Sequence, residues 1–421
     1  MMLGIDFGTS NSATAFVDAQ GGLVHIPLEG DADRPSMPTA LFFSSESGQV
    51  AYGSAALRAY LSGEEGRLMR SIKSLLGSAL MDETTLVNGR PTTLFEIVVM
   101  FFRELKARSE AFVGHPVHAA MLGRPVHFVD DDRSGDDLAQ VTLERAARAA
   151  GFDTVAFQLE PIAAAFDFER SVRAETTVLV VDIGGGTSDF TVVRVRPGEH
   201  PSGERAEDIL ATTGVHIGGT DFDQLLSLRQ VMPLLGLGHI GPSGREVPSP
   251  VFFKLSTWHL IQQCYSRANL HEAGNLRHLY ADRVLHRRLM HVLHARDGHR
   301  LLAGVEAAKI ACSNSGAATR LDLDAIEHGL VAPLTPADLA GTLQDRLAKV
   351  VACARGCVLA AGVGHPDAVY LTGGSSALAP LGAAFEQAFP GVPTVTGDRF
   401  GSVVAGLATH GARQSVAPSM A

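Results

Sequence analysis

The chain has 421 residues, of which 46% are hydrophobic and 19% are charged, and its formal net charge at pH 7 is −10. These proportions are typical of a globular protein, and the length predicts two to four compact units. The acidic balance argues against a nucleic-acid-binding surface, and the lack of a secretory signal or of a run of about 18 apolar residues favours a soluble, cytoplasmic protein without a membrane span.

Apolar strands alternate with helices along the chain. We expect strands at 3–5, 13–17, 117–122, 178–181, 190–195 and 368–371, and helices at 93–112, 138–150, 163–168 and 379–388. Thr93 and Glu96 form a capping box for the first of these helices, and Gly151 closes the second. Residues 221–304 read as mostly helical, and 412–421 as a frayed tail. This alternation predicts the α/β fold class.

One pattern occurs twice, at residues 4–10 and 181–187. In each copy a short apolar strand ends in Asp, and a glycine turn that carries hydroxyl residues follows. A polyphosphate must approach backbone N–H groups closely, which a Cβ atom would prevent, and carboxylate oxygens suit Mg²⁺. We therefore interpret the repeat as two phosphate-binding hairpins, with Asp6 and Asp182 as magnesium ligands through water. Two ordinary hairpins whose turns need glycine are the alternative.

Other nucleotide-binding signatures do not apply. The sequence contains no G-x-x-x-x-G-K-[ST] motif. A formal G-x-G-x-x-G occurs at 236–241, but it runs into Pro242 and not into a helix, so it lacks the context of a dinucleotide-binding motif.

Further motifs follow in a fixed order: Glu-Pro-Ile-Ala-Ala-Ala at 160–165, Gly-Gly-Thr-Asp-Phe-Asp at 218–223 and Gly-Gly-Ser-Ser at 373–376. Together with the two hairpins, they resemble the actin-like ATPase superfamily and, within it, the DnaK-type 70 kDa heat-shock chaperones. The resemblance extends from residue 3 to about 409, although 224–300 matches poorly. It implies a two-lobed α/β fold of duplicated ribonuclease H-like domains with a nucleotide cleft between the lobes.

The same resemblance implies domain bounds. Lobe I would comprise 1–171, with 397–421 returning to it, and lobe II would comprise 172–396. The second lobe would include a mostly helical, histidine-rich subdomain at about 218–340. Only about a dozen residues follow 409, which resembles the short, YegD-like subgroup of the family, in which the peptide-binding domain is lacking.

The resemblance also implies which residues carry the chemistry. Lys73 would neutralise charge on the terminal phosphate, Glu160 and Asp182 would order the waters of Mg²⁺, and Asp189 would lie near the nucleophile. A surface position for Lys73 and a capping role for Glu160 are the plain alternatives. Contacts to ATP or ADP are expected from Gly8, Thr9, Ser10, Asn11, Gly184, Gly185, Gly186, Thr187, Gly218, Gly219, Glu306, Lys309, Ser313, Gly373, Gly374 and Ser375.

Two positions of the expected adenine pocket depart from the family pattern. Ile310 and Ala377 stand where the family has arginines that stack on the base. Each lost stack forfeits about 0.5–2 kcal/mol. We therefore expect adenine to bind roughly 10-fold more weakly than in a typical member if the two losses add.

The remaining polar clusters favour structural roles. Seven histidines between 259 and 299 lack the spacing of a metal site, and solvated helix faces are favoured over a partner-binding surface (His259, His271, His278, His286, His291, His294 and His299). Cys353 and Cys357 read as buried structural thiols because no second pair of ligands is evident.

These features predict a slow ATPase that uses ATP, ADP and Mg²⁺ and is chaperone-like. Its client or protein partner is unidentified, and neither nucleic acid nor membrane is expected to be a partner. A small-molecule kinase of the same superfamily, with Asp189 as catalytic base, and a nucleotide-gated scaffold are the alternatives.

Overall fold

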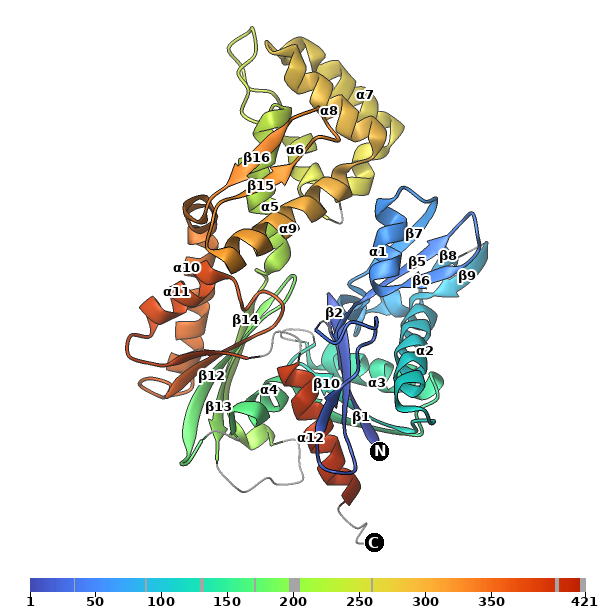
Figure 1. Cartoon of the computed structure of the whole chain (residues 1–421), viewed down its shortest axis with the longest axis vertical. Helices are drawn as coiled ribbons and strands as arrows, with labels where there is room; N and C mark the ends of the chain where they lie inside the picture. The colour runs from blue at the N-terminus through green and yellow to red at the C-terminus, as the bar shows by residue number, and fades with distance from the viewer. Residues whose placement is uncertain are drawn as a thin grey trace.

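The computed structural model describes residues 1–33, 35–87, 89–128, 132–169, 172–196, 205–258, 260–397 and 401–416. Figure 1 shows the course of the chain, in which several sheets alternate with helices. The expected α/β class is therefore confirmed. No helix in these ranges combines the length and the apolar character needed to cross a bilayer.

The first large sheet comes from the N-terminal part of the chain. Its strands are β1 (Met2–Phe7), β2 (Asn11–Val17), β3 (Leu23–His25), β10 (Ala119–Arg124) and β11 (Thr154–Leu159), and the short β4 (Met37–Pro38) pairs with β2. The spatial order is β11-β10-β1-β2-β3. β1 runs antiparallel to β2 and parallel to β10, and its apolar residues are buried because the strand lies inside the sheet.

The second large sheet repeats this arrangement. Its strands are β12 (Thr176–Ile183), β13 (Ser188–Val195), β14 (Ile209–Val215), β17 (Ala368–Thr372) and β18 (Thr394–Thr396), in the spatial order β14-β13-β12-β17-β18. In both sheets the first three strands pair antiparallel, and the later two add in parallel on the other side of the first strand. Asp6 and Asp182 are each the penultimate residue of that first strand.

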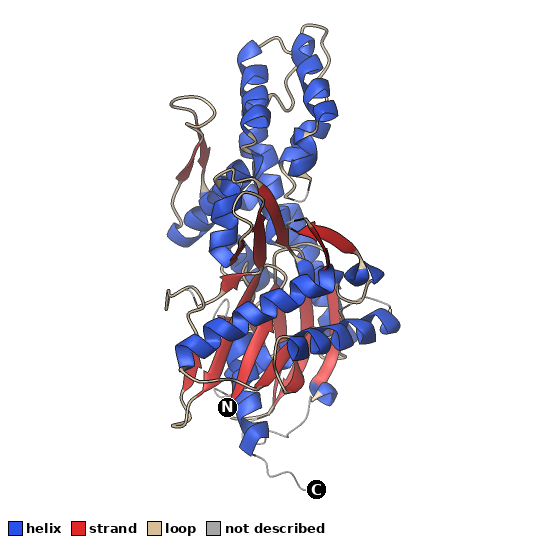
Figure 2. Cartoon of the chain, turned by 90° about the vertical axis from the view of Figure 1, so that its right-hand side faces the viewer, coloured by secondary structure: helices blue, strands red, loops and turns tan. Residues whose placement is uncertain are grey.

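Helices cover both sheets and also lie between them. α2 (Leu94–Val113) and α3 (Arg133–Ala149) share a core with the first sheet, and α10 (Pro336–Ala360) and α11 (Ala379–Ala388) share one with the second. Figure 2, which faces the side of α2 and α3, shows helices lying across the strands. α4 (Glu160–Glu169) and α12 (Ser402–Val416) join a core with strands of both sheets. This packing is close, since a Cβ on Gly406 of α12 would lie 2.0 Å from the carbonyl oxygen of Ala163.

Smaller elements extend above the sheets in Figure 1. On one side, β5 (Ala40–Ser44), β6 (Val50–Tyr52) and β7 (Gly66–Arg70) form a three-stranded sheet with α1 (Gly53–Leu61), beside the pair β8 (Thr84–Val87) and β9 (Arg90–Thr93). On the other side lie α5 (Gly219–Leu226), α6 (Pro250–Leu255), α7 (Arg267–Asn275), α8 (Arg283–Ala295), α9 (Gly298–Ser315) and the hairpin β15 (Thr319–Asp322) and β16 (Val331–Leu334).

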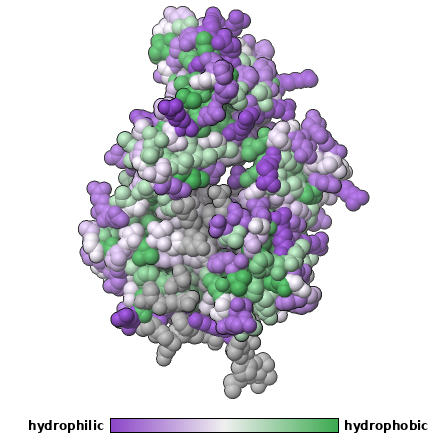
Figure 3. Space-filling model, in the orientation of Figure 1, coloured by the Kyte–Doolittle hydropathy of each residue, from purple (hydrophilic) through white to green (hydrophobic). Residues whose placement is uncertain are grey.

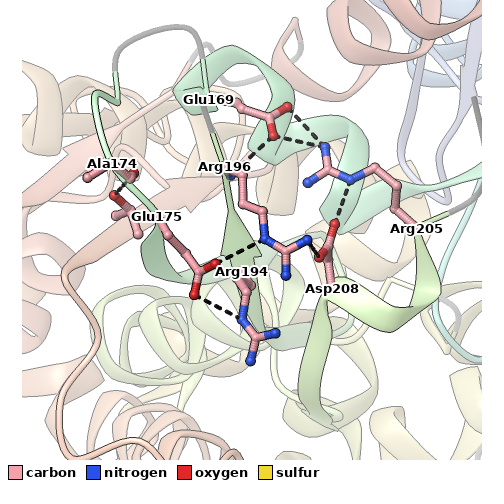
Figure 4. A network of polar contacts seen from close by, with 8 residues as sticks. Glu169, Ala174, Glu175, Arg194, Arg196, Arg205 and Asp208 are labelled. Carbon is pink, nitrogen blue, oxygen red and sulfur yellow. Dashed lines mark hydrogen bonds and ion pairs between the residues drawn. The ribbon is translucent and has the colours of Figure 1, made fainter. Parts of the chain in front are cut away.

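A buried ion network ties the end of α4 to the segment that enters β14 (Figure 4). The Arg205 guanidinium donates to Glu169 at 2.9 Å and to Asp208 at 2.6 Å, and all three side chains are buried. Arg205 also has a left-handed backbone conformation, with φ of 55°. Because charges removed from water need close partners, the network fixes how α4 meets the second sheet.

Most predicted elements form, although several of their ends differ from the prediction. The capping box of Thr93 and Glu96 and the left-handed Gly151 after α3 are confirmed. α3 begins at Arg133, earlier than predicted, and α4 already begins at Glu160, because a proline is tolerated in the first turn of a helix. The frayed tail predicted from residue 412 is wrong as far as 416, where α12 ends, and 417–421 lie outside the described residues.

Candidate functional site

Four charged side chains from four elements converge where the two large sheets approach each other. Asp6 comes from β1, Asp182 from β12, Glu160 from the start of α4, and Lys73 from the short 3₁₀ helix η1 (Ile72–Leu75). The Lys73 Nζ donates to the Glu160 Oε1 at 2.7 Å, and these side chains are only 11% and 14% exposed. Lys73 is therefore not a surface lysine, and its ion-pair partner Glu160 is 87 positions away in the sequence.

The electrostatics of this cluster are dominated by carboxylates. Burial, followed by the Glu160 carboxylate, raises the pKa of Asp6 to about 7 against the opposing effect of Lys73. Burial, followed by the carboxylates of Asp189, Glu160 and Asp6, raises the pKa of Asp182 to about 8. For Lys73, burial lowers the pKa, but Glu160 and Asp6 outweigh it and the net shift is upward. The site thus collects more negative charge than its one ammonium neutralises, which favours binding of a cation.

The two predicted hairpins touch each other at their turns. A Cβ built on Gly185 would lie 2.2 Å from the Ser10 hydroxyl, so a larger residue there would displace the Ser10 side chain. In the first hairpin the Gly8 carbonyl accepts from the Thr39 hydroxyl at 2.8 Å, while Thr9 lies in the turn and Asn11 opens β2. The repeated motif therefore brings its two copies together, although they are far apart in sequence.

Backbone from two later motifs supports the second hairpin. The Gly219 N–H donates to the Gly184 carbonyl at 3.0 Å, and a Cβ on Gly218 would lie 2.6 Å from the Gly185 backbone. The Ser375 hydroxyl donates to the same Gly184 carbonyl at 3.4 Å. Gly373 has φ of +85°, and a Cβ there would lie 2.2 Å from the Asp182 carboxylate. These glycine motifs form one wall around Asp182, with Gly374 exposed beside them.

The second hairpin is also open on one side. Gly186 and Thr187 are exposed, and a Cβ on Gly186 would meet no protein atom within 4 Å. The Thr187 hydroxyl donates to Asp189 at 3.1 Å, and Asp189 lies opposite Asp182 in the strand register. The backbone N–H groups of this turn are thus accessible to an external anion.

The expected base pocket lies between α9 and the loop before α11. The Ser313 hydroxyl donates to the Ala377 carbonyl at 3.2 Å and accepts from the Ala379 N–H at 2.9 Å, so these two walls are in contact. Ile310, 44% exposed, and the half-buried Ala377 present apolar surface there.

The charged residues of α9 near this pocket differ in exposure. Lys309 is buried, pairs with Asp223 at 2.8 Å and donates to the Gly219 carbonyl at 3.4 Å. The Glu306 side chain on the same helix is exposed.

Sequence reasoning missed contacts that join the upper elements above this site. The Arg70 guanidinium lies 5.0 Å from the ring centroid of Trp258. Burial lowers the pKa of Arg70, and the carboxylates of Glu306 and Asp223 offset only part of this shift. The Tyr60 hydroxyl is 2.8 Å from the Nδ1 of His299. Tyr60 and His299 are 239 positions apart in the sequence, and no local sequence pattern predicts their contact.

A pocket that is open to solvent adjoins the carboxylate cluster. Glu160, Asp182 and Asp189 line one part of it, and Pro125, Thr191 and Thr213 line others. It gives a small molecule access to the same carboxylates.

The residues present fit a magnesium ion bound through water. No group of three or more His, Cys, Asp or Glu side chains that could enclose a metal occurs among the described residues. Mg²⁺ commonly uses one or two carboxylates and completes its shell with water and phosphate oxygens. Asp6 and Asp182, whose charges repel one another, supply such a pair.

The prediction that the histidines lie on solvated helix faces is partly wrong. His286 and His299 are buried, and their ring nitrogens contact the carbonyls of Ala273 and Trp258 at 3.1 Å. A buried neutral imidazole needs such a partner, and burial lowers the pKa of His299 to about 4. His259 lies outside the described residues, and the other predicted histidines are exposed.

The two predicted thiols on α10 differ in burial. Cys357 is buried as predicted and Cys353 is half-buried, and neither forms a disulfide.

Comparisons with known proteins show which family the sequence resembles. The family model of the Hsp70 protein matches residues 2–230. The chaperone protein DnaK of Thermotoga petrophila and that of Thermotoga maritima are each 32% identical to the chain over 228 residues. The match covers 53% of this chain and 35% of each relative, so the chain matches about a third of the length of these relatives. The family match includes both hairpins, Lys73 and Glu160, and it ends before α9.

Proposed function

The chain belongs to the Hsp70 family, and on this premise we propose that it binds ATP with Mg²⁺ and hydrolyses the ATP slowly. The observation that carries the proposal is the contact of the two hairpins at Ser10 and Gly185, with Asp6, Asp182 and Lys73 beside it. Hairpins that meet in this way can grip one polyphosphate from both sides, and two glycine turns that served only their own strands would not need to meet.

The proposed architecture is the two-lobed actin-like ATPase fold with duplicated ribonuclease H-like domains. Lobe I would comprise 1–171 together with 397–421, and lobe II 172–396, with the helical subdomain at 218–340. The identical strand order of the two large sheets supports this duplication. α4 and α12, packed between the sheets, are the proposed place where the lobes pivot.

Each charged residue has a proposed role in hydrolysis. Glu160 holds the Lys73 ammonium beside the hairpins, where it neutralises charge that develops on the transferred phosphoryl group. Asp6 and Asp182 would hold Mg²⁺ through its waters, and the ion would supply further neutralisation of the phosphates. Asp189, exposed next to the open turn, orients the attacking water and accepts its proton.

The base pocket is proposed to select adenine weakly. Glu306 accepts a hydrogen bond from the nucleoside, Lys309 approaches the ribose, and Ser313 lines the base together with the apolar Ile310 and Ala377. Stacking on these two side chains lacks the cation–π attraction that a guanidinium would add.

Release of phosphate from ATP without any added acceptor tests the proposal. We expect slow release that requires Mg²⁺ and falls at least about 10-fold in Lys73→Ala and Asp182→Asn, whereas Lys349→Ala, which removes an exposed lysine from α10, leaves the rate unchanged. ATP bound without release in the wild type would refute hydrolysis, and no nucleotide binding at all would refute the whole proposal.

A small-molecule kinase is the second candidate, and the solvent-open pocket that Asp189 lines favours it. Asp189 would then accept the proton of an acceptor hydroxyl as the γ-phosphoryl group passes to that oxygen and ADP leaves. Phosphate release in the absence of acceptor, at the same rate with and without small polyols, would exclude this candidate. Association with a protein client or partner stays a prediction of the resemblance.

A further inference from the structure

The exposed side of α8 carries a row of basic and titratable side chains. Arg283, Arg287, His291 and His294 are all exposed, and their spacing of four, four and three residues places them on one face of the helix. We refer to these four residues as the α8 stripe. At 1.5 Å per residue the stripe is about 16 Å long. Figure 3 shows hydrophilic side chains projecting at the top of the molecule, where α7 and α8 lie.

The charge of this helix is opposite to that of the protein. α8 contains three arginines, three histidines and no carboxylate, while the whole chain carries −10. Like charges at helical spacing destabilise an isolated helix by a few tenths of a kcal/mol per pair. Arg283 and Arg287 form one such pair, and surface solubility does not explain its cost, because mixed charges would serve solubility equally well.

Two acids lie near α8, and each has a partner outside the stripe. Asp282 caps the helix by accepting from the Val284 N–H at 2.8 Å. Glu327 forms a two-point ion pair with Arg288, on another side of the helix, at 2.7 and 2.9 Å. The Glu327 carboxylate also interacts electrostatically with Arg287, and Arg283 donates to the Arg277 carbonyl at 2.5 Å. Among the described residues, none forms a close ion pair with a member of the stripe.

The stripe lies outside the part of the chain that matches the family. The family match ends at residue 230, well before α8. The kind of partner that this surface fits is therefore inferred from its own side chains. Four cationic or titratable groups in a row of about 16 Å complement a row of carboxylates on a polypeptide of similar length.

We propose that the α8 stripe is a docking surface for an acidic segment of a partner polypeptide. A nucleic acid fits this surface less well, because a polyanion of high charge density needs an extended basic footprint and would approach the negative remainder of the chain. A short acidic segment contacts the stripe alone. The proposal does not depend on nucleotide hydrolysis.

A fluorescein-labelled peptide of about eight glutamates, which spans roughly 26 Å when extended, is a suitable probe for fluorescence anisotropy at low salt. We expect the intact chain to bind it and the affinity to fall as salt is raised. Arg283→Gln combined with Arg287→Gln should weaken binding about 5-fold, since each exposed charge pair contributes a factor of roughly 2 to 5. Arg287→Glu alone should weaken it at least as much, and it serves if the double variant folds poorly.

The matched control is Arg90→Gln combined with Lys349→Gln, which removes two exposed charges from β9 and α10. This control should bind the peptide like the wild type. Equal binding by the control and both stripe variants would overturn the proposal. Tighter binding of a single-stranded DNA oligonucleotide with the same number of charges would overturn it as well, in favour of a nucleic-acid surface.

Discussion

Replacement of Lys73 by methionine perturbs the central charge cluster most directly. Its ammonium is largely buried, pairs with Glu160 at 2.7 Å and faces the carboxylates of Asp6 and Asp182. Removal of one partner from a buried ion pair destabilises a protein by about 3–5 kcal/mol. Because the raised pKa values of Asp6 and Asp182 let protons relieve part of the repulsion, we expect the lower end, about 3 kcal/mol.

Thermal unfolding followed by circular dichroism at pH 7.5 measures this effect. We expect Lys73→Met to lower the melting temperature by about 5 °C or more, and Lys349→Met, at an exposed site, to leave it unchanged. The double variant Lys73→Met with Glu160→Gln should recover most of the loss, because it removes the unpaired charge. A Lys73→Met protein that melts like the wild type, or a double variant less stable than both single variants, would refute the reasoning about this pair.

Four further predictions follow from the same structure. Asp182 has a folded pKa of about 8, above its value in an unfolded chain, so its burial is tolerated at low pH and destabilises the protein as pH rises through 8. Without Mg²⁺, the stability of Asp182→Asn relative to the wild type should therefore increase between pH 5 and 9. A difference in melting temperature that does not change with pH would contradict this. Ile310→Arg should strengthen ATP binding in calorimetry by a factor of about 2 to 30 through restored stacking, and unchanged affinity would count against the base pocket. Tyr60→Phe removes the hydroxyl that contacts His299 and should speed release of a fluorescent ADP by about 2- to 10-fold in stopped flow; an unchanged release rate would contradict a role of this contact in holding the nucleotide. Arg205→Met leaves the buried carboxylates of Glu169 and Asp208 without their ion-pair partner and should lower the free energy of unfolding by about 3 kcal/mol, measured by thermal unfolding. A stability equal to that of the wild type would show that the network does not stabilise the fold.

The sequence predicted the parts of the site that local chemistry defines. Each hairpin carries its own signal, an Asp at the end of an apolar strand and glycines in the turn, and the structure places these turns in contact. Lys73 and Glu160 could be chosen only through the resemblance, since a lone lysine has no local signature. Their ion pair depends on α4 crossing beside η1, which is a property of the tertiary fold.

The sequence did not predict contacts between the upper elements. Arg70, Trp258, Tyr60 and His299 meet across more than 180 positions of sequence, and none belongs to a motif. His299 and its neighbours read as a polar helix face, although the surrounding apolar residues bury it. The tail was misread for a related reason, because polar residues of α12 beyond 411 still continue the helix, where Gln414 contacts His410 one turn earlier.

The central claim, that both hairpins grip a single polyphosphate, is tested most directly by titration of ATP and Mg²⁺ into the Gly186→Val protein in a calorimeter. A Cβ at this position meets no protein atom within 4 Å, so we expect the protein to fold and melt normally while the valine occupies the space above the turn. We expect the wild type to bind one ATP per chain and the variant to bind at least about 30-fold more weakly, a loss of about 2 kcal/mol. Equal affinity of the two proteins would contradict the claim.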